Sequence, residues 1–282
     1  MKNVLQKTKV AIQGVYGAFH DMAAIHYFGK ENTELIAMNT FSDVFMSLRQ
    51  GMAEYGILAI ENSIAGSILP NYALLRESGM KISGEIYLKI EQNLLALPGQ
   101  TIADITEVYS HPMAILQCQE FFKKYPQIKL IDSLDTALSA KIIEEKGLPG
   151  TGAIASEYAA ERYHLQILAR GIQDHDVNYT RFLIVGRNGL APRHMVNKAS
   201  LHFALAHRIG SLAKVLSILS YFELNLTKIQ SLPIAGKEWE YQFYADVVFD
   251  DYTCYQQALE AIGPFTSGLG ILGEYIKGET VC

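Results

Sequence analysis

The first two-thirds of the chain is organised around one stretch, Asn178-Tyr179-Thr180-Arg181-Phe182, which combines an amide, a hydroxyl, a permanent cation and an aromatic ring. An apolar run, residues 182–185, follows at once and predicts a buried strand. A mostly polar run, residues 173–178, leads into it, although polar groups beside a buried strand need a partner or water. Arg181 suits a fixed anion, because a guanidinium can grip a carboxylate with two hydrogen bonds. The stretch alone favours a simpler interpretation, a loop that carries a surface arginine and leads into a strand.

Length and composition indicate a soluble globular protein of about two domains. The chain has 282 residues, of which 49% are hydrophobic, and a formal net charge of −5. This composition excludes a disordered chain, and no basic cluster suggests a nucleic-acid partner. Residues 1–7 contain no long apolar run, and no segment reaches the roughly 20 apolar residues of a membrane span. The three cysteines are scattered, lack metal-ligand spacing and fit a reducing cytoplasm.

The N-terminal part predicts a doubly wound sheet, because strand-like and helix-like segments alternate. Strands are expected at 9–12, 35–37 and 56–60, and helices at 23–28 and 40–48. Ligands of such sheets bind beyond the carboxyl ends of the strands, where two stretches of this chain lie. The first is the turn from Gly14 to Gly17, which lacks the full phosphate-loop pattern and is interpreted as a plain tight turn.

The second stretch is Glu61-Asn62-Ser63, which places an acid, an amide and a hydroxyl at one corner after a strand. One interpretation is that the three side chains form a small polar wall of a pocket. The other is that Asn62 or Ser63 caps a following helix, which explains only one of the three residues. The sequence leaves both interpretations open.

A second α/β lobe is predicted after Lys81. Residues 82–97 alternate like extended segments between lobes, and strands are expected at 108–109, 128–131, 152–155 and 165–168. Ser110-His111-Pro112 begins a helix that carries Gln117, and capping explains Ser110 as well as ligand binding does. His111 is a candidate base or a structural histidine. The stretch from Asp132 to Thr136 begins another helix, largely with capping chemistry.

The chain returns to the first lobe near Thr180, so the expected ligand site is a cleft between the lobes. Its candidate lining is a set of neutral hydrogen-bonding side chains with one arginine: Asn62, Ser63, Ser110, Gln117, Thr136, Thr180 and Arg181. This set fits a small anion that is bound without a metal or a nucleotide.

The last third predicts a separate domain with the order β-α-β-β-α-β, a ferredoxin-like unit. Its expected strands are 200–206, 225–233, 239–249 and 270–275, and its expected helices are 209–219 and 255–262. A turn is expected at Gly236-Lys237. The boundary is the segment from Arg187 to Lys198, which is rich in glycine, proline and polar residues.

Five stretches together resemble the prephenate dehydratase family: Glu61-Asn62-Ser63, Ser110-His111-Pro112, Gln117-Cys118, Asp135-Thr136-Ala137 and Asn178 to Phe182. The resemblance implies a catalytic domain over residues 1–189, with a two-lobed, periplasmic-binding-protein-like α/β fold. Lobe one would comprise about 1–80 and 170–189, and lobe two about 81–169. At the first glycine turn the chain carries Ala18-Phe19-His20, where the family usually has a small residue, an aromatic residue and Ser.

The resemblance implies that prephenate loses carbon dioxide and hydroxide to become phenylpyruvate, a reaction of L-phenylalanine biosynthesis that needs no cofactor. Thr180 would then hydrogen-bond or protonate the departing hydroxyl, Arg181 would grip a carboxylate or brace its strand, and Phe182 would keep the site dry. Glu61 would orient its neighbours or hold a proton. Asn62, Ser63, Ser110 and Gln117 would donate to substrate oxygens. Further substrate-binding candidates are His111, Thr136 and Asn178.

The C-terminal domain, residues 198–282, resembles the ACT regulatory domain that follows this catalytic region in the family. The resemblance implies an amino-acid site, L-phenylalanine as effector and a homo-oligomer, either a dimer or a tetramer. Its expected binding residues are Gly210, Ser211, Leu212, Asn225 and Leu226. The chain has Ile209 in place of the family's usual proline, and Gln230 and Leu232 in place of charged residues. The alternative is a purely structural dimerisation domain.

Two alternative functions stay open at this point. One is arogenate dehydratase, since arogenate differs from prephenate only in carrying an amine where prephenate has a ketone. The other is a non-catalytic protein that senses amino acids, because two lobes around a cleft also suit solute binding. Neither alternative expects a membrane or nucleic-acid partner.

Overall fold

A computed structural model describes residues 7–234, 236 and 240–281, which fall into two compact units. The first unit comprises residues up to Gly66, residues 86–182 and the C-terminal residues from Thr280. The second comprises residues 67–85 and 183–279. Trp239 and Lys237, which the sequence assigns to a strand and a turn, lie outside the described residues.

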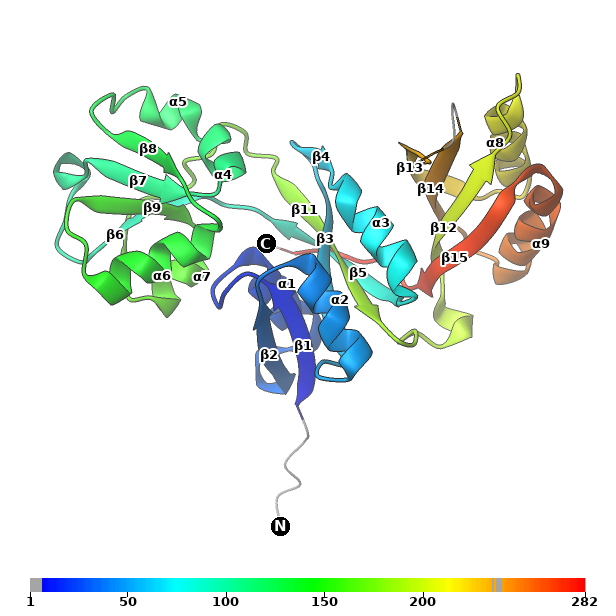
Figure 1. Ribbon diagram of the computed structural model, residues 1–282, viewed down its shortest axis with the longest axis horizontal. Helices are drawn as coiled ribbons and strands as arrows, with labels where there is room; N and C mark the ends of the chain where they lie inside the picture. The colour runs from blue at the N-terminus through cyan, green and yellow to red at the C-terminus, as the bar shows by residue number, and fades with distance from the viewer. Residues whose placement is uncertain (1–6, 235, 237–239, 282) are drawn as a thin grey trace, which may run out of the picture. The chain divides into compact units, whose positions relative to one another are not determined.

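The first sheet of the first unit has the predicted β-α-β-α-β order. Its parallel strands are β1 (Thr8–Gln13), β2 (Thr33–Met38) and β3 (Tyr55–Asn62), and its helices are α1 (Phe19–Phe28), the short η1 (Lys30–Asn32) and α2 (Phe41–Gln50). Thr40 begins α2 as predicted, because its hydroxyl accepts the amide of Asp43 at 3.1 Å. Both helices pack on β1 (Figure 1). The central residues of this strand are fully buried.

The strand order continues from β3 to β11 (Tyr179–Gly186) and β5 (Lys81–Lys89), both of which run on into the second unit. The short strand β4 (Gly66–Ser67) pairs with β3, and β16 (Thr280–Val281) pairs with β5 at Tyr87 and Leu88. The amide of Ser63 donates to the carbonyl of Tyr179 at 2.8 Å, so β11 begins where β3 ends. The carboxyl ends of the parallel strands therefore meet the start of β11 at one edge.

The second sheet of the first unit has the strand order β10-β6-β9-β7-β8. Its strands are β6 (Asn93–Ala96), β7 (Glu107–Ser110), β8 (Lys129–Asp132), β9 (Thr151–Ala155) and β10 (Gln166–Ala169). Its helices are η2 (Ile102–Asp104), α4 (Pro112–Leu116), α5 (Gln119–Phe122), α6 (Thr136–Lys146) and α7 (Glu157–Arg162). The apolar residues Leu94, Val108 and Ile154 form a buried core. The predicted extended run 82–97 is thus two strands, because β5 ends at Lys89 and β6 begins at Asn93.

The structure excludes two capping interpretations that the sequence left open, and in each case a tertiary contact uses the polar side chain. The helix after Glu61-Asn62-Ser63, α3 (Leu69–Ser78), begins only at Leu69, so neither Asn62 nor Ser63 caps it. The cap of α4 is His111 rather than Ser110, because the His111 ring accepts the amide of Met113 at 3.2 Å. Ser110 ends β7, and its hydroxyl donates to the carbonyl of Ile154 at 2.7 Å.

The second unit contains the predicted β-α-β-β-α-β order after the segment around η3 (Arg193–Met195). Its elements are β12 (Lys198–Leu205), α8 (Ser211–Tyr221), β13 (Asn225–Pro233), β14 (Tyr241–Val248), α9 (Tyr252–Ile262), η4 (Gly263–Phe265) and β15 (Ser267–Tyr275). Their strands are antiparallel in the order β13-β14-β12-β15. Leu201, Phe203 and Tyr255 belong to the core between this sheet and its helices.

A buried ion pair also belongs to the second unit. The Lys198 ammonium lies 2.8 Å from a carboxylate oxygen of Glu85, and the two side chains are 2% and 0% exposed. The amide of Gly278 donates to the same carboxylate at 3.0 Å. A buried charge is tolerated where such partners replace the lost water.

Candidate active site

Asn62 is the centre of the candidate site. Its amide nitrogen lies 2.8 Å from the Asn178 side-chain oxygen, 3.0 Å from the Thr180 hydroxyl and 3.2 Å from the Tyr179 carbonyl. Its side-chain oxygen accepts the backbone amides of Ile64 and Ala65 at 3.0 and 2.9 Å. Asn62 is 9% exposed. The side chain is therefore fixed at both ends, and it presents its donors to the start of β11.

Asn178 extends this network to the second sheet. Its side-chain nitrogen donates to the Gln117 side-chain oxygen at 3.0 Å, and Gln117 caps the C-terminus of α4. Ser63 also links the end of β3 to the start of β11. Its hydroxyl accepts the Tyr179 amide at 2.9 Å and donates to the Val177 carbonyl at 3.3 Å. The predicted residues Asn62, Ser63, Gln117, Asn178 and Thr180 are thus brought together.

The three residues of the central motif point to alternate faces of β11, as successive strand residues do. Thr180 and Phe182 share one face, and Arg181 lies on the other. All three are buried, with exposed fractions of 8%, 1% and 4%. The Arg181 guanidinium lies 5.9 Å from the centre of the Tyr87 ring of β5. The hydroxyl and the guanidinium therefore face different surroundings.

Of the remaining predicted residues, His111 and Thr136 lie at helix starts beside the second sheet, whereas Ser110 ends β7 and Glu61 lies in β3. Thr136 is the first residue of α6 and is 8% exposed, while His111 is exposed at the start of α4. Asp135 caps α6, because its carboxylate accepts the Leu138 amide at 2.9 Å. Burial raises the pKa of the Asp135 carboxyl, while its backbone hydrogen bonds and nearby His111 oppose that shift.

The first glycine turn bridges the two sheets, which the sequence did not reveal. A side-chain carbon at Gly14 would lie 3.2 Å from a carboxylate oxygen of Asp135. The carbonyl of Gly17 accepts the Ser156 hydroxyl at 3.0 Å, and the carbonyl of Tyr16 accepts the Tyr163 hydroxyl. The only sequence signal for this contact was the pair of glycines, both of which have positive φ.

His20 is a second residue that sequence reasoning did not assign to the site. Its ring packs edge-on against the Phe182 ring, with centres 5.0 Å apart, and at a tilt against the Phe41 ring, with centres 5.4 Å apart. Burial lowers the pKa of this histidine to about 4, so the ring is neutral near pH 7. Its Nε2 atom is buried and has no hydrogen-bond partner within the described part of the chain.

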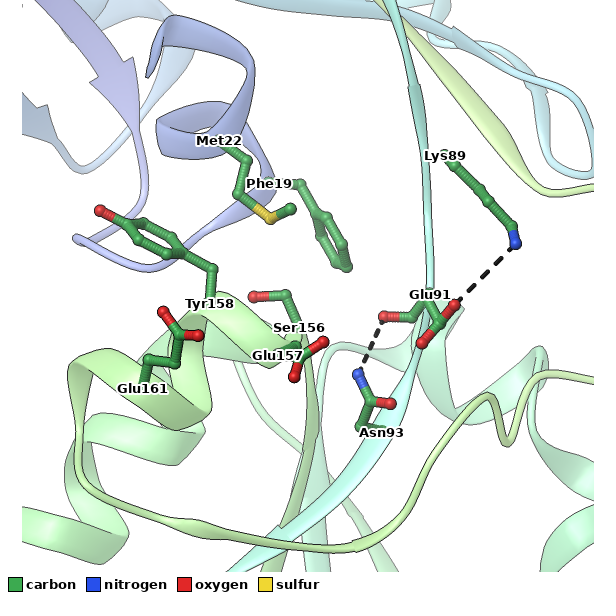
Figure 2. Close-up of a pocket in the computed structure, with 9 residues that line it drawn as sticks. All are labelled: Phe19, Met22, Lys89, Glu91, Asn93, Ser156, Glu157, Tyr158 and Glu161. Atoms are coloured by element: carbon green, nitrogen blue, oxygen red, sulfur yellow. Dashed lines mark hydrogen bonds and ion pairs between the residues drawn. The ribbon is translucent and has the colours of Figure 1, made fainter. Parts of the chain in front are cut away.

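A cavity of about 340 Å³ lies on another side of α1. Figure 2 shows the Phe19 ring pointing into it, above Ser156 at the start of α7. Its lining is part apolar and part acidic: Phe19, Met22, Lys89, Glu91, Asn93, Ser156, Glu157, Tyr158 and Glu161. The predicted site residues are not among these lining residues of the described chain.

The fold and the site together define a class: an α/β protein with a hydroxyl held by amide side chains at the carboxyl edge of a parallel sheet. The family model described as prephenate dehydratase matches residues 10–189. The chain belongs to the prephenate dehydratase family.

Two curated relatives match nearly the whole chain. The bifunctional chorismate mutase/prephenate dehydratase of Aquifex aeolicus is 36% identical over 274 residues, which cover 96% of this chain and 74% of the relative. Arogenate dehydratase 1 of Petunia hybrida is 38% identical over 295 residues, which cover 97% of this chain and 68% of the relative.

Two solved structures share the fold over nearly the whole chain. GqqA, described as a novel type of quorum quenching acylase, is 32% identical with a TM-score of 0.85, and the match covers 95% of this chain and 98% of GqqA. Prephenate dehydratase from Arthrobacter aurescens in complex with L-Phe is 25% identical with a TM-score of 0.86, and the match covers 96% and 90% of the two chains.

The described residues contain no group of three or more His, Cys, Asp or Glu side chains that could hold a metal ion. Their helices are all too short or too polar to cross a membrane.

Proposed function

We propose that this protein is a prephenate dehydratase that converts prephenate to phenylpyruvate, carbon dioxide and water in L-phenylalanine biosynthesis, as a cytoplasmic enzyme. The observation that carries the proposal is the hydrogen bond from Asn62 to the Thr180 hydroxyl, at 3.0 Å. Because the Thr180 oxygen accepts this bond, its own hydrogen is directed elsewhere and can be donated to the substrate. Because the chain belongs to the prephenate dehydratase family, the reaction proposed for the Thr180 hydroxyl is the dehydration of prephenate.

The proposed reaction needs one proton donor and no electron acceptor. The bond between the ring and its carboxylate breaks, the electron pair moves through the ring, and the carbon–oxygen bond to the hydroxyl breaks. The hydroxyl leaves with a proton, as water, and the ring becomes aromatic. A hydrogen-bond donor that is already positioned where charge develops in the transition state raises the rate by about 10²–10³-fold. Thr180 orients or relays this proton more than it ionises, since a threonine hydroxyl is a very weak acid.

The other motif residues support Thr180 in this proposal. Arg181 braces β11 against β5, since its side chain lies near Tyr87 on the opposite face from Thr180. Phe182, a residue of β11, excludes water from the site. Ser110 is fully buried and holds β7 to β9 through its hydroxyl, so it acts as a support. Glu61 orients its neighbours.

The substrate oxygens are proposed to meet amide and hydroxyl donors. Gln117 and Asn178 already lie within 3.0 Å of each other in the Asn62 network. Ser63, His111 and Thr136 complete the set at the surrounding strand and helix ends. These hydrogen-bonding groups suit a dianionic substrate, because they stabilise its charge without a metal ion.

We further propose that residues 198–282 form an ACT regulatory domain, and residues 1–189 the catalytic domain. A cavity of about 140 Å³ lies at the start of α8, between Arg208, Ser211, Leu212 and the facing residues of β14. It includes two residues of the predicted amino-acid site, and Gly210, Asn225 and Leu226 are the others. The Arthrobacter aurescens relative binds L-Phe, which supports phenylalanine as the effector here.

Titration with phenylalanine tests the regulatory proposal. Activity and oligomer mass are measured together, and we expect activity to change as a dimer or tetramer binds the amino acid. A protein that responds in neither property has a purely structural C-terminal domain.

A direct assay tests the proposed function. Chelator-treated protein is mixed with prephenate, and phenylpyruvate is followed by its absorbance in base. Turnover supports the dehydratase, while binding without turnover supports a non-catalytic sensor. Competition between prephenate and arogenate then identifies the preferred substrate, because relatives of both kinds match this chain.

Acylase activity is a second candidate function, and the observation that favours it is the match to GqqA at 32% identity over 98% of that chain. The test incubates the same preparation with an N-acylated amine and measures the released amine. Release that is lost in Thr180→Ala would place both reactions at one site. Absence of release removes this candidate.

A further inference from the structure

The first turn of α1 lies at the same edge of the sheet as the candidate site. The chain leaves the carboxyl end of β1, passes the glycine turn and begins α1 at Phe19. It leaves β2 in the same way and begins α2 at Phe41. The start of β11 runs past this edge, beside the end of β3. His20, Phe41 and Phe182 come into contact there as a result.

His20 lies on the face of β11 that carries Thr180. Residues two apart on a strand point to the same face, and they are separated by about 6.7 Å along it. The His20 ring contacts Phe182 at 5.0 Å, with the two ring planes at 81°. His20 therefore packs on the ring that lies two positions along β11 from Thr180, a spacing of about 6.7 Å that a substrate the size of prephenate can span.

The Nε2 atom of His20 has an unused hydrogen-bonding capacity. It is buried, and the described residues offer it no hydrogen-bond partner. A neutral imidazole has one donor and one acceptor nitrogen, and most buried polar atoms in proteins are satisfied. The pKa of about 4 that burial gives His20 keeps the ring neutral, so it can serve in either role at neutral pH.

The histidine is not sealed inside the protein. The residue as a whole is only partly buried, so part of it lies at the surface. Rotation about the bond that joins the ring to its side chain is soft and roughly two-fold for histidine. Such a rotation can turn Nε2 toward a ligand while the ring stays beside Phe41 and Phe182.

We propose that Nε2 of His20 hydrogen-bonds an oxygen of the bound substrate, so that His20 is a further substrate-contacting residue of the dehydratase site. The inference rests on the proposed function, because it takes prephenate as the ligand. It explains why a polar ring occupies an aromatic cluster that phenylalanine would fill without an unpaired nitrogen. The unpaired nitrogen of the free protein is then satisfied in the complex.

Three variants test this proposal by steady-state kinetics on prephenate. His20→Phe keeps a ring of similar size and removes the nitrogen, and His20→Gln restores a polar atom. The matched control is His26→Phe, an exposed histidine on the same helix. We expect His20→Phe to melt at or above the wild-type temperature and to lose about 10- to 100-fold in kcat/KM. His20→Gln should recover part of that loss, and His26→Phe should equal wild type.

A spectroscopic measurement keeps the test decisive if the phenylalanine variant folds poorly. The nitrogen chemical shifts of His20 in the wild-type protein are recorded with and without phenylpyruvate, the proposed product. A shift of Nε2 that saturates with phenylpyruvate supports the contact. An unchanged Nε2, or a well-folded His20→Phe within twofold of wild-type kcat/KM, overturns it. Wild-type protein that leaves prephenate unchanged would instead refute the proposed function, and the two failures are distinct.

Discussion

At the scale of single residues, the candidate site depends on one hydroxyl and the amide that holds it. Asn62 and Thr180 lie 118 positions apart in the chain, yet their side chains are hydrogen-bonded. Thr180 is 8% exposed, so bulk water competes little for that bond. A hydroxyl oriented in this way needs little reorganisation when the leaving group departs.

Replacement of Thr180 should therefore lower the rate more than the affinity. We expect Thr180→Ala to reduce kcat by about 10²–10³-fold with little change in KM, because a bond made mainly in the transition state is lost. Thr180→Ser keeps the hydroxyl and is the matched control, with most of the activity retained. Steady-state kinetics on prephenate measures both variants. Near-normal turnover in Thr180→Ala would remove this residue from the mechanism.

His20 should make the folded state sensitive to mild acid. Its pKa is lowered to about 4 in the folded protein, against an ordinary value of 6.5. Between pH 6.5 and pH 4 this histidine is protonated in the unfolded chain and neutral in the folded protein. The free energy of unfolding therefore has its full value above pH 6.5 and decreases as the pH falls toward 4. The loss over this window is about 3 kcal/mol, at about 1.4 kcal/mol per pH unit.

Urea unfolding of wild type and His20→Phe at pH 7 and pH 4.5 measures this effect. The difference between the two proteins isolates His20 from the carboxylates, including neighbouring Asp21, whose pKa burial raises. We expect the free energy of unfolding to fall more steeply with acid in wild type than in the variant. Equal acid sensitivity in both would show that His20 takes up its proton in the folded state.

At the scale of elements, the glycine turn after β1 contacts α6 and α7 of the second sheet. Gly14 has φ of +99° and lies against the Asp135 carboxylate, while Gly17 has φ of +89° and accepts the Ser156 hydroxyl. The interpretation of residues 14–17 as a plain tight turn describes the backbone. It does not reveal that two helices more than 100 positions later pack against that backbone.

Gly14→Ala should be more harmful than the same change at Gly99. Both glycines have positive φ, at +99° and +85°, so both substitutions carry the backbone strain of about 1 kcal/mol. Only Gly14 has a neighbour, Asp135, at 3.2 Å, whereas a side-chain carbon at Gly99 meets nothing within 4 Å. We expect a larger loss of stability and of kcat/KM for Gly14→Ala. Equal effects would mean that Asp135 moves aside without consequence.

At the scale of the whole molecule, the described chain forms two units, and the second contains a buried charge pair. Lys198 opens β12 and Glu85 lies in β5, and their side chains are almost wholly buried. Glu85 also accepts the amide of Gly278 at 3.0 Å. A buried pair adds little net stability by itself, but loss of one partner leaves an uncompensated charge.

Lys198→Met should destabilise the protein by about 3–5 kcal/mol, because Glu85 would remain buried without its cation. The control is Lys141→Met, since Lys141 and Glu145 form a solvent-exposed pair on α6 at 3.7 Å. Such a pair contributes about 0.5 kcal/mol or less. Urea unfolding compares the two variants with wild type. Similar small losses in both would mean that Glu85 becomes protonated or reaches water.

The sequence by itself predicted the alternating strands and helices of the first unit and the β-α-β-β-α-β order of residues 198–275 in the second. Strand and helix periodicity and the capping at Thr40 depend on residues that are close together in the sequence. A short stretch of sequence is therefore enough to predict them. The family motifs then named Asn62, Gln117 and Thr180 as candidate site residues before any distance was known.

Only the tertiary structure decided which partners these polar groups take. It placed the start of α3 at Leu69, gave the cap of α4 to His111 and set Arg181 beside the Tyr87 ring. It also brought His20 to Phe182 and Gly14 to Asp135. The physical reason is that a buried polar group or ring is satisfied by whatever lies beside it in space. That neighbour is set by strand order and helix packing, which a local pattern does not contain.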